Sequence, residues 1–409
     1  MRLLDYASAS RCPAGNDVCR RVHALEPTLP IRPTFDTSHA TPCIVASDVV
    51  DGCAALPAVH VLAGWHMLTD DVKGFFFKSA IYSDRLDIRP DHACFNMWRT
   101  SADALRWVQT WGRRPMSNST LMVTDSCGSK VMTWQPEYAG RYWSAPFEMR
   151  ERTNNTGTAA AIQTHDEAMG TKGIGTEPTP PFVMLQLYHS APVRIIATLR
   201  NPVDRLETAF WFHKQFWSVY GPTASGLHAY ASEQVRDFTK CSDVFGTRRC
   251  AFLFERLGPS QAQAFWHCNQ IIRGLYEPFV AEWHAAFAAH GKERAAGRHS
   301  SLLVLRVEDM LDRPSTSRAA LQEFLFGVHG GGGDDKTADA RAATAGPSST
   351  RSYADSHAAS MNVSCCGGGR GAPEQMLQST RDVLSGFYRP HNARLAALLG
   401  DDRFLLWDT

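Results

Sequence analysis

The sequence predicts an α/β protein in which one central parallel sheet is flanked by helices. The segment "VRIIATL" (193–199) is mostly apolar and rich in β-branched residues, as expected for a parallel strand that is buried on both faces. Strand-like runs alternate with helical stretches along the chain, which favours a parallel sheet with covered faces. With 409 residues, of which 44% are hydrophobic, the chain is long enough for one large domain with a sizeable core.

The order of the elements follows from hydrophobic periodicity and from turn residues. Residues 1–40 are rich in Pro, Ala, Ser and Arg and predict an irregular N-terminal lead-in. The predicted strands cover 43–50 ("CIVASDVV"), 119–126, 193–199 and 300–310. The predicted helices cover 96–111, 202–219, 259–290 and 315–327, and a further helical pattern runs from Met376 to Leu398 with a break at Pro390.

We expect residues 41–409 to form a single domain with two irregular stretches. Residues 153–181 are rich in Gly, Thr and Pro and predict a long surface loop, whose end "TEPTPP" is not expected to open a helix. Residues 329–360 nearly lack large apolar side chains. Such a segment buries too little surface to offset its ordering entropy, so it predicts a flexible low-complexity insertion.

Charge and histidine spacing exclude several classes of function. The formal net charge is +1, whereas proteins that bind nucleic acid or anionic membranes usually carry a basic excess. We therefore expect no nucleic-acid partner, and any anion site must be local. The 16 histidines are dispersed without paired ligand spacing, which predicts no metal site.

The eleven cysteines indicate an oxidising compartment. They are widely and irregularly spaced and form no C-x-x-C pair, a pattern that favours scattered disulfides. Glycosylation sequons at Asn118, Asn154 and Asn362 are compatible with this location. No signal peptide or membrane anchor is visible in "MRLLDYASASRCPAGNDVCRR", because it contains no long apolar run. Either the protein is cytosolic or its true start is missing, and we expect the second.

Arg200 lies where the strand at 193–199 hands over to a helix. Asn201 suits the N-cap position and Pro202 the first helical turn, and Thr208 follows Asn201 by about two turns, at roughly 3.6 residues each. Ligands of open α/β sheets bind outside the carboxyl ends of the strands. An arginine and a hydroxyl on one side of a helix there make a phosphate clamp. The alternative is an arginine that pairs with a carboxylate at a strand end.

The stretch "RIIATLRNPVDRLETAFWFH" (194–213) resembles the 3′-phosphate-binding segment of sulfotransferases that use 3′-phosphoadenylyl sulfate (PAPS), especially the Golgi carbohydrate sulfotransferases. Their pattern is an apolar strand, then R-[ND]-P-x-x-R, then a serine. In that family the first arginine and the serine grip the 3′-phosphate of the donor. The resemblance implies that Arg200 and Thr208 bind this phosphate, with threonine keeping the hydroxyl.

Three later segments resemble the same family, in the family's order. They are "IIRGLYEPFVAEWHAAF" (271–287), like its G-x-Y helix; "LLVLRVEDMLDRPSTSRAALQEFLFGV" (302–328), like its strand, Glu-Asp turn and helix; and "TRDVLSGFYRPHNARLAALLG" (380–400), like its terminal helix. Ahead of the G-x-Y helix lie three cysteines, Cys241, Cys250 and Cys268. Their placement resembles that in the branch of N-acetylgalactosamine 4-sulfate 6-O-sulfotransferases. The resemblance covers residues 190–400 well, apart from the insertion, and 42–135 faintly.

The segment "GGRGAP" (368–373) resembles the family loop that closes over the donor, which makes Gly369 and Arg370 donor-binding candidates. Glycines let the backbone approach an anion and point N–H groups at it, while the arginine supplies charge. A simple linker is the alternative.

The family's 5′-phosphosulfate loop, K-x-G-T-T, is not preserved. At the end of the predicted strand 43–50, we place Gly52 on the family glycine, which makes it a donor-binding candidate. This puts Val50 at the lysine position and Cys53 and Ala54 at the two threonines. Both the charge and the hydroxyls that stabilise the leaving sulfuryl group are lost there.

The family's catalytic glutamate is missing as well. "VKGFFFKSA" (72–80) resembles its K-E-x-x-F-F element, but Gly74 stands where the glutamate belongs. Asp71, or its neighbour Asp70, is the candidate base, unless both are only exposed loop acids. "TDSCGSKVMTW" (124–134) resembles the stretch that lines the acceptor cleft, and its Lys130 is the candidate that replaces the loop lysine.

The resemblance implies a single P-loop-like sulfotransferase domain that transfers a sulfuryl group from PAPS to a carbohydrate hydroxyl, without a metal. The expected acceptor is a glycosaminoglycan-like or other sulfated polysaccharide, and the expected location is the Golgi lumen or the secretory pathway. A nucleotide kinase is disfavoured, because no G-x-x-x-x-G-K-[ST] loop is present. The alternative is a catalytically impaired relative that binds nucleotide or glycan without turnover.

Overall fold

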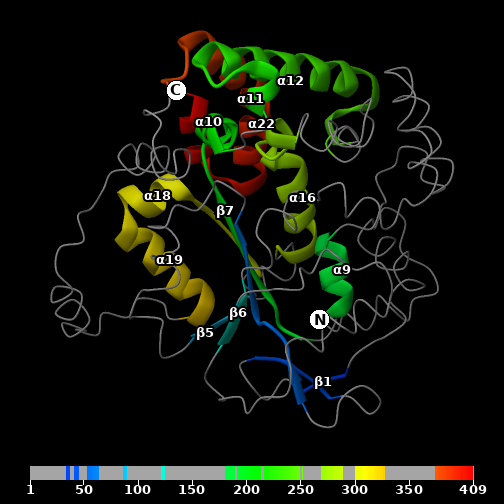
Figure 1. Ribbon diagram of the computed structural model, residues 1–409. Helices are drawn as coiled ribbons and strands as arrows, with labels where there is room; N and C mark the ends of the chain where they lie inside the picture. Colours follow the sequence, from blue (N-terminus) through cyan, green and yellow to red (C-terminus); the bar gives the residue numbers. More distant parts are fainter. Residues whose placement is uncertain are drawn as a thin grey trace.

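The structure is a computed structural model (Figure 1) that describes residues 34–36, 41–45, 53–63, 86–89, 121–124, 180–188, 191–212, 216–248, 251, 269–288, 300–327 and 374–408. Within these residues, a parallel sheet stands at the centre and helices lie on its two faces and beyond one end (Figure 1).

The central sheet has five strands, and all neighbouring strands run parallel. In spatial order they are β5 (Leu86–Arg89), β6 (Leu121–Thr124), β4 (Val59–Ala63), β7 (Arg194–Leu199) and β8 (Leu302–Arg306). The predicted α/β class with a central parallel sheet flanked by helices is therefore confirmed. The predicted strands at 119–126 and 193–199 are confirmed as β6 and β7.

Alternate residues of β7 point into two different cores, as side chains of a doubly covered strand must. Ile195, Ala197 and Leu199 pack with α9 (Pro180–Leu187) and α16 (Tyr276–Phe287). Ile196 packs with α18 (Val307–Asp312) and α19 (Pro314–Phe326) on the opposite face. Figure 1 shows these two helix pairs on either side of the sheet.

A third cluster of buried side chains lies among helices beyond the carboxyl end of β7. Its helices are α10 (Pro202–Phe212), α12 (Ala224–Phe245), α15 (Asn269–Ile272), α16 and α22 (Gln378–Leu399). The short helix η4 (Asp402–Asp408) follows α22 and folds back onto it. Buried Phe404 and Trp407 of η4 join the core on the α16 face of the sheet.

The N-terminal strands differ from the prediction. β1 (Thr34–Asp36), β2 (Cys43–Val45) and β3 (Cys53–Ala55) form a separate antiparallel sheet. The prediction that 43–50 leads the parallel sheet is wrong, and residues 34–36 within the expected irregular lead-in are a strand. Cys43 of β2 is disulfide-bonded.

Two helix termini were predicted wrongly because proline has different costs at different positions. α9 begins at Pro180 in the "TEPTPP" stretch. The N–H groups of the first helical turn form no intrahelical hydrogen bonds, so proline loses no bond there. α22 continues through Pro390 instead of breaking. Pro390 is exposed, and so is Gly386, whose carbonyl would otherwise accept the missing bond and can be hydrated instead.

Other predicted elements are adjusted. The strand predicted at 300–310 ends at Arg306, and the chain enters α18. The helix predicted at 259–290 is described only from residue 269, as α15 and α16 with a turn between them. α12 was not predicted. The helix at 96–111, the insertion at 329–360 and residues 153–179 of the expected loop lie outside the described residues. None of the described helices combines the length and apolarity needed to cross a bilayer.

Candidate functional site

The carboxyl edge of the sheet contains a reversal in strand order. From β4 the chain continues to β5 on one side, and after β6 it crosses β4 to reach β7 on the other side. Such a switch point is where open α/β sheets bind ligands. Ala63 of β4 pairs with Thr198 of β7, so the chain leaves both strands at the same level. Arg200 is the first residue after β7.

The N-terminus of α10 has the predicted capping arrangement. The Asn201 side-chain carbonyl accepts the amide of Val203 at 2.9 Å, and the Asn201 backbone carbonyl accepts the amide of Arg205 at 2.9 Å. Asp204 lies in the first turn, where a negative charge interacts favourably with the helix dipole. The short N-cap side chain therefore fixes where β7 stops and where the helix begins.

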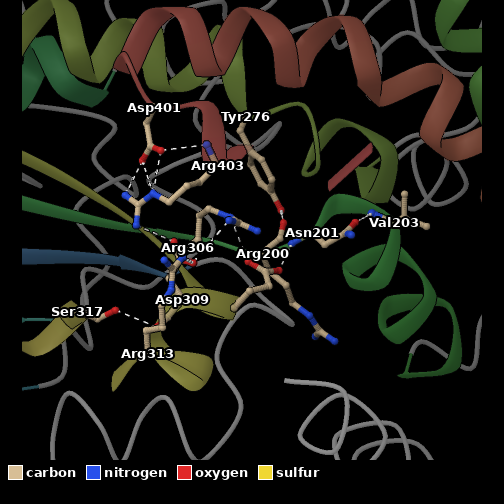
Figure 2. A network of polar contacts seen from close by, with 11 residues as sticks. Arg200, Asn201, Val203, Tyr276, Arg306, Asp309, Arg313, Ser317, Asp401 and Arg403 are labelled. Carbon is tan, nitrogen blue, oxygen red and sulfur yellow. Dashed lines mark hydrogen bonds and ion pairs between the residues drawn. The ribbon is translucent and has the colours of Figure 1, made fainter. Parts of the chain in front are cut away.

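Arg200 is held by its backbone from two sides (Figure 2). The Tyr276 hydroxyl of α16 donates to the Arg200 carbonyl at 2.7 Å. The Asn201 amide donates to the Glu308 carboxylate of α18 at 2.6 Å, and burial raises the pKa of Glu308. The Arg200 side chain is only 1% exposed, so its guanidinium is fixed at a buried strand end.

Thr208 lies on the same helix as predicted, and it is 1% exposed. Its hydroxyl donates to the Asp204 carbonyl at 3.0 Å, a common contact within a helix. A phosphate needs donors, so a phosphate contact would require this hydroxyl to rotate away from the Asp204 carbonyl. The structure places Arg200 just before α10 and Thr208 within it, and a joint clamp would require that rotation of the Thr208 hydroxyl.

Two carboxylates on the same helix modify the charge near Arg200. Asp204 forms an ion pair with Arg381 of α22 at 3.1 Å. Glu207 accepts the Met376 amide at 3.1 Å. Burial, followed by the nearby charge of Asp204, raises the pKa of Glu207 to about 7, while Arg381 and Arg200 act in the opposite direction. Both sequence interpretations of Arg200, anion clamp and carboxylate neighbour, are therefore compatible with its surroundings.

A charged network next to Arg200 anchors the C-terminus (Figure 2). Asp309 of α18 contacts Arg403 at 2.9 Å, Arg313 at 2.5 Å and Arg306 at 3.6 Å. The Arg306 guanidinium also lies 5.4 Å from the centre of the Trp407 ring. Each of these arginines has a carboxylate partner, so the network is structural and ties η4 to the end of β8.

The sequence motifs that resemble those of sulfotransferases include buried scaffold residues, whose roles the sequence did not predict. Tyr276 of the G-x-Y motif holds Arg200, as described above. Tyr388 of "FYRPHN" donates to the Ile271 carbonyl at 2.9 Å, and its ring occupies the space beside Gly274. Asn392 of the same motif donates to the Asp408 carboxylate at 2.8 Å. The sequence signal that could have predicted these roles is the position of each tyrosine or asparagine within its motif.

The other predicted site residues, Gly52, Asp71, Lys130, Gly369 and Arg370, lie outside the described residues. The strand prediction that placed Gly52 on the donor loop is wrong, because the strands beside β7 are β4 and β8, and 43–50 is not among them. In sequence, β4 is followed by Gly64. Within the described residues, no three His, Cys, Asp or Glu side chains are grouped to hold a metal ion.

Comparisons with known proteins point to one family. No protein-family model matches the chain. Carbohydrate sulfotransferase 15 of Homo sapiens is 24% identical over 242 residues, which cover 57% of this chain and 35% of the relative. The Mus musculus and Rattus norvegicus proteins of that name are 24% and 23% identical over the same length and with the same coverage. The chain thus spans about a third of the length of these curated relatives, 35%.

Among solved structures, a sulfotransferase from Alicyclobacillus acidocaldarius overlays with a TM-score of 0.39 at 14% identity, covering 87% of this chain and 100% of that one. An overlay this loose adds nothing to the fold assignment, which rests on the strand order itself. The similarity to carbohydrate sulfotransferases that the sequence motifs predicted is confirmed by the three curated relatives, and over 57% of its length this chain is similar to carbohydrate sulfotransferase 15.

Proposed function

We propose that this protein binds PAPS and transfers its sulfuryl group to a carbohydrate hydroxyl. The observation that carries the proposal is Arg200, a buried guanidinium at the carboxyl end of β7, one residue before the N-cap of α10. A helix N-terminus and an arginine fork both favour a phosphate. The relatives named carbohydrate sulfotransferase 15 support the carbohydrate acceptor.

The 5′ end of the donor is expected at the neighbouring strand, β4. A loop after Ala63 emerges next to Arg200, because Ala63 pairs with Thr198. We therefore propose Gly64 as a second candidate beside Gly52 for the family glycine. Placing Gly64 there puts Leu62 at the lysine position and Trp65 and His66 at the threonines. Neither placement supplies a lysine.

The remaining site assignments are proposals from sequence. Lys130 follows the end of β6 by six residues, and β6 is the strand beside β4 on the other side of the switch point. We propose Lys130 as the cation that stabilises the departing phosphate and Asp71 as the base for the acceptor hydroxyl. Gly369 and Arg370 are proposed to contact the donor, a few residues before the segment that begins at Glu374.

A catalytically impaired protein that binds nucleotide or glycan is the second candidate function. It is favoured by the absence of the family lysine at either loop glycine and by Gly74 at the glutamate position. We further propose a glycosaminoglycan-like or other sulfated acceptor and a location in the Golgi lumen or secretory pathway, supported by the branch resemblance and the disulfide-bonded Cys43.

The test is a titration of the purified protein with 3′-phosphoadenosine 5′-phosphate, followed by transfer of labelled sulfate from PAPS to a glycan panel. Arg200→Ala should weaken nucleotide binding by about 2 kcal/mol, and Arg200→Lys should restore part of it, because lysine lacks the bidentate fork. Arg236→Ala, an exposed arginine on α12, serves as the matched control. Unchanged affinity in a folded Arg200→Ala variant would exclude the clamp, and binding without transfer to any glycan would favour the second candidate.

A further inference from the structure

Glu207 is a buried carboxylate in the helix that carries the proposed phosphate clamp. It lies on the second turn of α10, between Arg200 and Thr208 in sequence, and is 5% exposed. Asp204, three residues earlier, faces the same side of the helix, and such a pair of like charges is mutually destabilising. The site therefore places two acids close together next to the residue proposed to hold an anion.

The positive and polar groups around Glu207 come from three other parts of the chain. The Met376 amide donates to Glu207 Oε1 at 3.1 Å from the segment that precedes α22. Arg381 of α22 forms its ion pair with Asp204, and Arg200 approaches from the end of β7. Because the amide donates to Oε1, a proton can reside on Oε2 without breaking the Met376 contact.

The charge balance of this cluster depends on Arg200. Among the described residues, Arg381 and Arg200 are cations that favour the ionised form of Glu207, and burial and Asp204 favour the neutral form. A phosphate that binds Arg200 brings up to two negative charges and offsets the effect of this cation. The support that Arg200 gives to the ionised carboxylate is then lost, and Arg381 is shared with Asp204, which it contacts at 3.1 Å. Under those conditions the carboxylate is more stable as the neutral acid.

We propose that binding of a nucleotide phosphate at Arg200 is coupled to uptake of one proton from solvent by Glu207. The inference rests on the proposed function, because it needs a phosphate at Arg200, and it goes beyond it by naming a group that senses that phosphate. By linkage, the coupling is reciprocal: protonation of Glu207 strengthens phosphate binding by the same factor. Glu207 is a positioning residue, since its own contact is with the Met376 amide.

The pKa of about 7 sets the range in which the coupling is measurable. At pH 7.5 most of the unliganded protein carries an ionised Glu207, so binding should take up roughly half a proton or more per nucleotide. The affinity should fall roughly fivefold from pH 7 to pH 8, and this pH dependence should disappear when residue 207 does not titrate.

The experiment is calorimetric titration with 3′-phosphoadenosine 5′-phosphate at pH 7.5 in HEPES and in Tris, whose different heats of ionisation report the protons exchanged. Wild type should show proton uptake, and Glu207→Gln should bind without it. Protonation changes of the nucleotide itself occur in both proteins and cancel in the comparison. Glu374→Gln is the matched control, because exposed Glu374 holds another amide, that of Ala224, at 2.7 Å. It should keep the uptake of wild type.

A second variant keeps the test valid if Glu207→Gln does not fold. Asp204→Asn removes the like charge, so the pH of half-maximal uptake should move below that of wild type. Equal proton uptake in wild type and Glu207→Gln, or an unmoved midpoint in Asp204→Asn, overturns the coupling while leaving the proposed function intact. A wild-type protein that binds no nucleotide overturns both.

Discussion

The Tyr276 hydroxyl lies 2.7 Å from the backbone carbonyl of Arg200 and donates a hydrogen bond to it. This contact joins the first residue of α16 to the residue that follows β7, and both residues are buried. Tyr276 is the tyrosine of the G-x-Y motif, so the motif preserves a support for the proposed phosphate clamp and not a group that would touch the donor.

Tyr276→Phe should therefore weaken nucleotide binding as well as stability. Removing the hydroxyl takes one partner from a buried carbonyl, which costs about 1 to 3 kcal/mol of unfolding free energy. Greater freedom of the Arg200 backbone should lower the affinity for 3′-phosphoadenosine 5′-phosphate several-fold. The measurements are chemical denaturation and calorimetric titration.

Tyr388→Phe is the matched control for that experiment. The Tyr388 hydroxyl also donates to a backbone carbonyl, that of Ile271 at 2.9 Å, and the residue is equally buried. It should lose a similar amount of stability and keep the nucleotide affinity of wild type. If the two variants change the affinity equally, Tyr276 has no special role at Arg200.

Gly274 should not tolerate a side chain. A Cβ atom at this position would lie 2.6 Å from the Tyr388 hydroxyl and 2.7 Å from the ring carbon that bears it. Gly274→Ala should destabilise the protein by roughly 1 to 3 kcal/mol, because the Tyr388 ring is fully buried and cannot move aside without disturbing α22. Thermal or chemical denaturation measures the effect.

The control for Gly274→Ala is Gly386→Ala in α22, where an added Cβ meets no atom within 4 Å. Alanine favours a helix over glycine by about 1 kcal/mol, so this variant should be neutral or more stable than wild type. Combining Gly274→Ala with Tyr388→Leu should recover part of the loss, since the two residues are in contact and their effects do not add. A Gly274→Ala protein as stable as wild type would show that α22 can shift at little cost.

Glu207 predicts a dependence of stability on pH in the absence of any ligand. Its pKa is raised from 4.5 to about 7, so its contribution is fully present below about pH 4.5 and is lost as the pH rises through about 7. Glu207→Gln removes this loss. The stability of wild type relative to Glu207→Gln should therefore fall between these two pH values, by an amount on the order of 3 kcal/mol, and stay constant above them.

Parallel denaturation curves of the two proteins from pH 4.5 to pH 8 provide the measurement. Glu374→Gln, which removes an exposed carboxylate near Met376, should track wild type. A constant difference between wild type and Glu207→Gln across the range would contradict a titration of Glu207 near neutral pH.

The sequence predicted the strand-to-helix junction at Arg200 well because local signals agree there. An apolar run fixes β7, and Asn201 and Pro202 start α10 with contacts inside one segment. β4 was missed because its strand contains a histidine. His60 is fully buried, and burial lowers its pKa to about 3. Its Nε2 lies 3.0 Å from the Tyr188 hydroxyl, a partner 128 residues away that no local pattern reveals.

The misplacement of the first strand had a direct consequence for the candidate site. "CIVASDVV" has a stronger strand composition than "VHVLA", yet β2 pairs only with β1 and β3, and it is β4 that lies beside β7. The donor loop was therefore sought after β2, two strands before the end of β4. α12 was missed although Leu227, Tyr230 and Phe238 recur at near-helical spacing, because polar residues separate them. That face becomes part of a core only through tertiary packing against other helices, including α10 and α22.

The final prediction concerns whether the protein turns over its donor. The family lysine is absent at both candidate loops, with Val50 before Gly52 and Leu62 before Gly64, and Leu62 is moreover fully buried in the core. If Lys130 supplies the missing charge, Lys130→Ala should slow single-turnover sulfate transfer about 100-fold or more. Asp71→Asn should do the same if Asp71 deprotonates the acceptor. Both variants should keep the wild-type fold.

Lys240→Ala replaces an exposed lysine on α12 and is the control for loss of a positive charge. Rapid-quench measurement with labelled PAPS gives the rates.

If nothing replaces the lysine and the glutamate, wild type itself should bind nucleotide but transfer sulfate slowly. The rate should be at least roughly 10⁴-fold below that of a relative that has both groups, because each group contributes a factor of about 100. Fast transfer that is insensitive to Lys130→Ala would mean that another cation faces the leaving phosphate. Arg370 would then be the next residue to replace. Apart from Arg200 at the β7–α10 junction, it is the charged residue among the proposed donor contacts.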